Sequence, residues 1–125
     1  MNTHRKGKFW ENVVVNYLKS QGVITYDVAK PVKFQNNDFF GIFDIVYYHN
    51  NQHFWIQVTD KHHKSQKLKE FSNFPLWSNQ YLYLYNTNNN TIDILIRTER
   101  EFVHVNTINA TEIINSMKKK KSKQK

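Results

Sequence analysis

The chain has 125 residues, the size of one domain with a single modest core, and we expect no second domain. Its 18 lysines and arginines outnumber its 10 aspartates and glutamates, and the formal net charge of +8 is typical of proteins that meet phosphate backbones. The absence of cysteine excludes a disulfide framework and a thiolate metal site.

Apolar residues recur at helical spacing over residues 8–21, and Gly22 follows as a stop signal, so this segment is predicted to be the first helix. Residues 23–34 are rich in β-branched and aromatic types but contain Pro31, which is typical of an edge strand or a bent strand. Two further apolar runs, residues 41–48 and 53–59, are predicted to form a hairpin around the polar turn HNNQ.

The second half continues with a predicted helix at residues 64–71 and two strands, QYLYLYN and TIDILIR, joined by the polar turn TNNN. Residues 102–105 add a short strand, and residues 110–117 close the domain as a helix. The alternating tyrosines of QYLYLYN are interpreted as a sheet face packed beneath a helix, in preference to a platform for unpaired bases. We therefore predict an α/β fold with a mixed sheet of about five strands flanked by helices.

We expect no signal peptide and no membrane span in this sequence. The basic N-terminus runs into an amphipathic pattern and lacks the unbroken apolar stretch of a signal peptide, and no segment approaches a membrane span. We therefore expect a cytoplasmic protein with no membrane partner. The run KKKKSKQK at residues 118–125 has no apolar anchor and predicts a disordered basic tail after a domain of residues 1–117.

Two hydrophilic side chains interrupt the apolar runs of the predicted hairpin, namely Asp44 and Gln57. A carboxylate among aromatic residues is costly to bury unless it is paired, hydrogen-bonded or bound to a cation. Strand alternation places Gln57 and Thr59 on one face, together with Lys61 if the strand continues. Asp44, Glu11 of the first helix and the amide oxygen of Gln57 would form a hard oxygen site for Mg²⁺ or Mn²⁺.

A structural role explains the same residues without a metal. Asp44 could pair with Lys30 or Lys33, and Gln57 could satisfy backbone groups of the sheet. Spacing alone leaves both interpretations open.

Three short motifs nevertheless resemble those of the PD-(D/E)XK nuclease superfamily, and within it the Holliday-junction-resolvase-like branch. They are Glu11 on the first helix, Asp44 in the segment DFFGIFD, and the segment WIQVTD followed by a basic helix. The succession is similar to that of small phage and bacterial proteins with a variant Q-x-T motif. The resemblance covers about residues 8–71, and it implies a restriction-endonuclease-like core.

The resemblance implies a metal-dependent DNA endonuclease that hydrolyses phosphodiester bonds with Mg²⁺ or Mn²⁺, that selects branched DNA as resolvases do, and that acts as a homodimer. Asp44 matches the metal-binding aspartate and Glu11 the glutamate of the helix. Gln57 occupies a position usually held by an acid, and Thr59 the position of the usual lysine. Lys61 could supply the missing positive charge from two residues further on.

These two departures leave a second function open. Glutamine is a neutral ligand, and threonine cannot place a positive charge beside the attacked phosphate. The alternative is a catalytically inactive DNA-binding accessory protein on the same fold. A third alternative is a protein-interaction module whose basic tail is incidental.

Basic residues flank the predicted site in the sequence and are expected to contact DNA phosphates. A solvated charged surface explains any one of them equally well. The candidates for DNA binding are Arg5, Lys6, Lys8, Lys64, Lys67 and Lys69.

Overall fold

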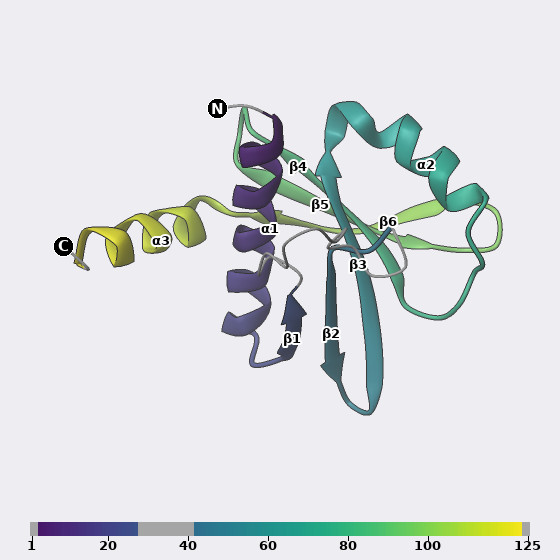
Figure 1. Cartoon of the computed structure of the whole chain (residues 1–125), viewed down its shortest axis with the longest axis horizontal. Coiled ribbons are helices and arrows are strands. Elements are labelled where there is room, and N and C mark those ends of the chain that lie inside the picture. Colours follow the sequence, from purple (N-terminus) through teal and green to yellow (C-terminus); the bar gives the residue numbers. More distant parts are fainter. Residues whose placement is uncertain (1–2, 28–41, 124–125) are drawn as a thin grey trace, which may run out of the picture.

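A computed structural model describes the backbone of residues 3–27 and 42–123 and the side chains of residues 6–23 and 42–119 (Figure 1). The part of the first predicted strand after Asp27 lies outside the described residues. The elements in chain order are α1 (Thr3–Ser20), β1 (Ile24–Asp27), β2 (Ile45–His49), β3 (Gln52–Asp60), a 3-10 turn η1 (Lys61–His63), α2 (Lys64–Ser72), β4 (Gln80–Asn86), β5 (Thr91–Arg97), β6 (Phe102–Asn109) and α3 (Thr111–Lys123).

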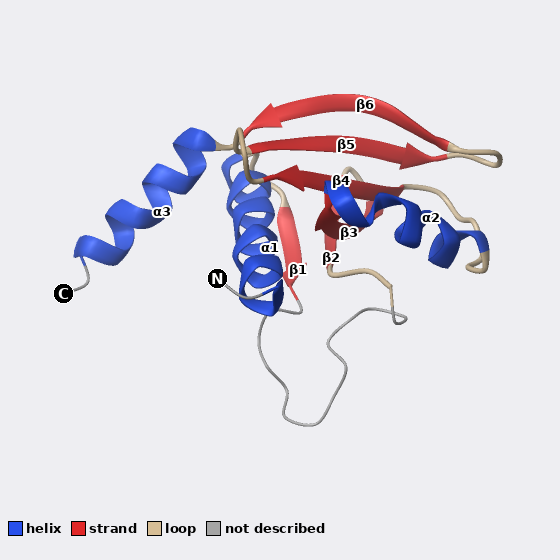
Figure 2. Ribbon diagram, turned by 90° about the horizontal axis from the view of Figure 1, so that it is seen from above, coloured by secondary structure: helices blue, strands red, loops and turns tan. Residues whose placement is uncertain are grey.

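The strands form one mixed sheet in the order β1-β2-β3-β4-β5-β6 (Figure 2). Every neighbouring pair is antiparallel except β3 and β4, which run parallel. A parallel pair needs a crossover, and α2 supplies it between β3 and β4. The predicted α/β class with a mixed sheet is confirmed, with six strands where about five were expected.

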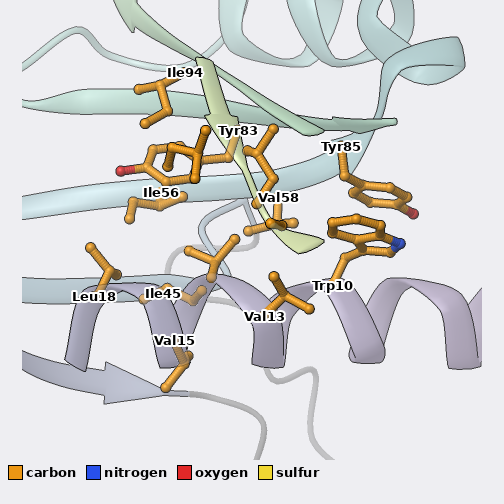
Figure 3. Close-up of a cluster of buried hydrophobic side chains, with 14 of the residues drawn as sticks. Trp10, Val13, Val15, Leu18, Ile45, Ile56, Val58, Tyr83, Tyr85 and Ile94 are labelled. Atoms are coloured by element: carbon orange, nitrogen blue, oxygen red, sulfur yellow. The ribbon is translucent and has the colours of Figure 1, made fainter. Parts of the chain in front are cut away.

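One face of the sheet is covered by α1. Trp10, Val13 and Leu18 of this helix are buried against apolar side chains of β2 to β5 (Figure 3). Trp10 stacks on Tyr85 with ring centroids 5.0 Å apart. Tyr83 is buried in the same cluster, so the interpretation of the tyrosine row as a packed sheet face is confirmed.

The opposite face is covered by α2. Strand alternation directs the leucines of β4 to this side, where they pack with Phe43 and Phe71. Phe43 is fully buried at the centre of an aromatic cluster, and its ring centroid lies 5.4–5.9 Å from those of Trp55, Phe71, Phe74 and Trp77. Because α1 and α2 lie on opposite faces, each side of the sheet has its own apolar core.

Several element boundaries differ from those predicted. α1 begins at Thr3, five positions before Lys8, and β2 begins at Ile45, after Asp44. α3 ends at Lys123, well beyond Met117, because lysine is a good helix former and continues the last turn. α3 therefore takes in most of the segment expected as a tail, and the boundary of the domain at residue 117 stays a prediction.

No helix in the described part of the chain combines the length and the apolar character needed to cross a membrane.

The aromatic cluster around Phe43 makes a testable contribution to stability. We expect Phe43→Ala to lower the free energy of unfolding by roughly 3–5 kcal/mol, because the substitution leaves a cavity in a closely packed site. Urea unfolding followed by circular dichroism measures the change. Leu76→Ala is the control, because Leu76 is 43% exposed and its truncation should cost less than about 0.5 kcal/mol. Equal effects of the two substitutions would contradict a core role for Phe43.

Candidate functional site

The candidate site lies where β2 and β3 separate. Their pairing ends at Ile45 and Ile56, whereas β3 continues to Asp60 along β4. The last four residues of β3, Gln57 to Asp60, therefore have a ladder partner on one side only. Buried backbone groups need hydrogen bonds, so the side of β3 that faces away from β4 must find other partners.

Two buried side chains satisfy the backbone of Val58 on this side. The Asp44 carboxylate accepts a hydrogen bond from the Val58 N–H at 2.8 Å, and Gln57 Nε2 donates to the Val58 carbonyl at 3.3 Å. The backbone N–H of Asp44 also donates to the Ile56 carbonyl at 2.9 Å. Asp44 is 6% exposed and Gln57 is 5% exposed. The structural role for Gln57 is thereby confirmed, while pairing of Asp44 with Lys30 or Lys33 falls outside the described residues.

Gln57 and Thr59 point to the same face of β3, as predicted. In the parallel register they lie beside Leu82 and Leu84 of β4, on the side that α2 covers. Thr59 is 8% exposed, and its hydroxyl provides no positive charge.

Lys61 does not continue this face. β3 ends at Asp60, whose carboxylate accepts a hydrogen bond from the His62 N–H at 2.8 Å and caps η1. The chain turns there, and Lys61 becomes the first residue of η1. The expectation that Lys61 shares the face of Gln57 and Thr59 is therefore wrong, because an aspartate cap stops the strand one residue earlier.

Asp60 itself is a buried acid that the sequence did not single out. Its Oδ2 lies 2.9 Å from Lys6 Nζ of α1, and the residue is 7% exposed. Burial by itself would raise the pKa of Asp60, but the hydrogen bond from His62 and the ion pair with Lys6 outweigh burial and hold this pKa below its ordinary value. An aspartate between a strand and a helical segment is a capping signal, which could have identified it.

Glu11 and Asp44 lie at the same end of the sheet as Asp60. Burial, together with the nearby charges of Asp60, Glu11 and Asp44, raises the pKa of Tyr85 to about 12. All three carboxylates are therefore within electrostatic reach of one tyrosine. No three His, Asp or Glu side chains in the described ranges are arranged to hold one metal ion.

A cavity of about 430 Å³ opens beside this acidic end of the sheet. Lys6, Asp60, Lys61 and His62 line one side, and residues 86–88 of the β4–β5 turn line the other. Two of these lining residues are lysines, and one of them is held by Asp60. The cavity thus combines cationic side chains with a polar turn, a combination that suits an anion.

The other predicted DNA-binding residues differ in their surroundings. Lys64 and Lys69 of α2 are exposed, whereas Lys67 forms an ion pair with Glu70 at 3.1 Å. Lys8 is half-buried on α1. The side chain of Arg5 lies outside the described residues. Lys6 and Lys64 lie close to the two ends of η1, so basic residues from both α1 and α2 flank the end of β3.

Comparisons with protein-family models, with curated proteins and with solved structures found no match. A functional assignment therefore depends on the residues of this chain.

The Lys6–Asp60 pair predicts a specific pH dependence of stability. The pKa of Asp60 in the folded state is lower than in the unfolded state, so ionised Asp60 adds to the free energy of unfolding. This stabilisation is complete above the ordinary aspartate pKa of about 4 and is lost as the pH falls through the folded-state pKa. Lys6→Met should destabilise the protein at pH 7 and much less at pH 2. Urea unfolding between pH 7 and pH 2 measures this convergence.

Lys8→Met, two residues along the same helix, is the matched control, and its unfolding curves should stay parallel to those of the wild type at every pH. If the Lys6→Met difference is also constant with pH, Lys6 does not stabilise ionised Asp60.

Proposed function

We propose that the chain is a metal-dependent DNA endonuclease with a restriction-endonuclease-like core, which hydrolyses phosphodiester bonds. The observation that carries the proposal is the burial of Asp44 and Gln57 together on the backbone of Val58, where β2 and β3 separate. The resemblance to PD-(D/E)XK nucleases expects Asp44 and Gln57 on two neighbouring strands. Asp44 directly precedes β2, Gln57 lies on β3, and β2 and β3 are paired neighbours, which supports the proposal.

The arrangement of elements supports the same proposal. A helix, three antiparallel strands, a crossover helix and a strand parallel to the third follow one another. The resemblance predicts such a mixed sheet flanked by helices. Asp44, just before β2, and Gln57, on β3, then fall at one end of the sheet, which Glu11 approaches from α1.

The chemistry of the donors fits a hard dication. Asp44 and Glu11 are carboxylates, and Gln57 can offer its amide oxygen because its Nε2 is the atom that bonds Val58. Mg²⁺ or Mn²⁺ held by these three residues would supply Lewis-acid activation of water and of the scissile phosphate.

The remaining roles belong to the side chains of the protein. Asp60 holds Lys6 at the cavity beside the site, and Lys61 lines the same cavity from η1. These two ammonium groups would offset negative charge on a bound phosphodiester, the task that Thr59 cannot perform. Lys64 and Lys69 on α2 would hold the DNA backbone without reading its sequence. Selection of branched DNA and action as a homodimer follow from the resemblance alone.

A specific observation favours the second function, a catalytically inactive DNA-binding accessory protein. Gln57 and Thr59 are both neutral, and Gln57 already serves the backbone of β3. Such a site would bind a dication weakly and would lack a lysine on the strand. The basic surface that flanks β3 would remain useful for DNA binding.

Two substitutions test the metal site. Gln57→Glu should raise the affinity for Mn²⁺, since it adds a carboxylate next to Asp44. Asp44→Asn should abolish Mn²⁺ binding and cleavage, yet its amide oxygen can still accept the Val58 N–H, so the fold should persist. Calorimetric titration with Mn²⁺ and cleavage assays on linear, single-stranded, flapped and four-way DNA provide the readouts.

The outcomes separate the two functions. Wild-type cleavage that Asp44→Asn removes supports the endonuclease. Binding of DNA in EDTA without cleavage under any metal condition supports the accessory protein. If the wild type and both variants bind Mn²⁺ equally, or none binds it, Asp44 and Gln57 do not form a metal site.

Phosphate binding by α2 gives a further prediction. Lys64→Ala and Lys69→Ala should each weaken DNA binding similarly for all sequences and lower the salt slope of log K by about one unit, because each removes one phosphate contact. Fluorescence anisotropy in EDTA measures the slope. The salt concentration is varied from about 50 to about 200 mM, roughly the range over which phosphate contacts lose affinity. Lys19→Ala is the control, since Lys19 lies about 20 Å along α1 from Lys6. A loss confined to particular sequences would argue against phosphate contacts.

A further inference from the structure

A cavity of about 510 Å³, separate from the one beside Asp60, lies between α2 and the turn that joins β5 to β6. Figure 1 shows α2 running from the end of β3 toward this turn. The volume falls within the range of about 300–1,000 Å³ that is typical of small-molecule sites. Apart from Lys64, none of the residues that line the cavity has a role in the proposed endonuclease.

One part of the cavity lining is apolar. Leu68 and Phe71 of α2 contribute to it, together with Phe102 of β6. Phe71 is 1% exposed, and its ring meets the ring of Phe102 edge to face, with centroids 5.0 Å apart. Leu68 and Phe102 are only partly buried. The ring of Phe102 is therefore held by Phe71 and remains accessible to a flat apolar group of a ligand.

Three cationic side chains line the same cavity, namely Lys64, Arg97 and Arg100. In the described part of the chain none of the three forms an ion pair. Lys64 and Arg100 are exposed, whereas Arg97 is partly buried, and burial lowers the pKa of its guanidinium. A partly buried cation without a carboxylate partner is stabilised when an anion binds beside it.

Hydrogen bonds fix the position of the Arg97 guanidinium. Nη1 donates to Gln80 Oε1 at 2.8 Å and to the Pro75 carbonyl at 3.2 Å, and Nη2 donates to the Phe74 carbonyl at 2.7 Å. The guanidinium carbon also lies 5.5 Å from the centroid of the Phe71 ring. All three acceptors are neutral, so they hold the guanidinium without cancelling its charge. The positive charge is therefore in place before a ligand arrives, which lowers the cost of binding.

The turn at residues 98–101 supplies both charged and polar groups to the cavity. The Thr98 N–H and hydroxyl donate to the Glu101 carbonyl at 2.8 and 2.7 Å, and the Glu101 N–H donates to the Thr98 hydroxyl at 3.1 Å. Arg100 extends from this fixed turn, and the carboxylates of Glu99 and Glu101 line the cavity with it. Because carboxylates accept hydrogen bonds and repel anions, a fitting ligand needs hydrogen-bond donors as well as a negative group.

We propose that this cavity binds a free nucleoside monophosphate. The base would lie against Phe102, and the phosphate would meet the cations, Arg97 and Arg100 among them. The hydroxyl and amino groups of the nucleoside would donate to Glu99 and Glu101. Inorganic phosphate lacks the flat apolar part, and a nucleic-acid strand would bring further phosphates close to the two carboxylates.

The nucleotide site does not rest on the proposed endonuclease activity. Arg97 pairs with Phe102 where β5 ends and β6 begins, whereas Asp60 pairs with Tyr85 at the opposite end of β4. The tests use the full chain without DNA and in EDTA. A failure here leaves the metal site open, and a failure of the metal titration leaves the nucleotide site open.

Calorimetric titration with adenosine 5′-monophosphate gives the first test. We expect a dissociation constant below about 1 mM, and affinities for adenosine and for inorganic phosphate that are each at least about tenfold weaker, because each lacks one half of the ligand. Phosphate that binds as tightly as the nucleotide would overturn the proposal, as would a nucleotide that does not bind at about 1 mM. A single-stranded oligonucleotide that binds where the mononucleotide does not would also overturn it, because the occupant would then be a strand.

Two substitutions place the nucleotide in the cavity. Arg100→Gln should weaken binding of adenosine 5′-monophosphate by at least about tenfold, since it removes an exposed cation of the turn and leaves the packing unchanged. Phe102→Leu should weaken binding severalfold, because it removes the flat ring but keeps an apolar side chain. Lys19→Gln is the matched control, since it removes one positive charge from an exposed residue of α1 outside the cavity. An unchanged affinity of Arg100→Gln, or equal losses in Arg100→Gln and Lys19→Gln, would show that the nucleotide does not bind in this cavity.

Discussion

The hydrogen bond from the Val58 N–H to the Asp44 carboxylate is the interaction on which the rest of the site depends. β3 separates from β2 after Ile56, so the backbone N–H and C=O groups of its last residues lose their partners on that side. Such groups need other hydrogen bonds when they are buried. Asp44 meets this need by replacing a ladder bond with a side-chain bond. A charged acceptor makes the stronger kind of hydrogen bond, which suits a position where the sheet divides. Asp44 therefore stabilises the fold, independently of any role in catalysis.

Several charged side chains surround Asp44 at this end of the sheet. Asp44, Glu11 and Asp60 all approach the end of the sheet, and all three act on Tyr85. Lys6 neutralises part of this charge through Asp60, which in turn holds the start of η1. The ion pair therefore joins α1 to the point where β3 becomes α2. Any ligand that binds at this end, whether a cation or a phosphate, changes an electrostatic balance that also supports the packing of α1.

The sequence predicted the order of elements because the periodicity of each segment matches its burial. QYLYLYN, for example, alternates two residue types that pack into the two separate cores. The predicted ends of strands were wrong where a tertiary contact determines where the strand ends. The hydrogen bond of Thr107 to Asp93 supports the strand past Asn106, a residue type that is depleted in strands, so β6 runs four residues past Val105. The predicted position of Lys61 on the strand was wrong for a similar reason. Asp60 caps η1, so the strand ends before Lys61 and its alternation of faces does not continue. Long-range pairs of this kind leave no periodic signal in the sequence.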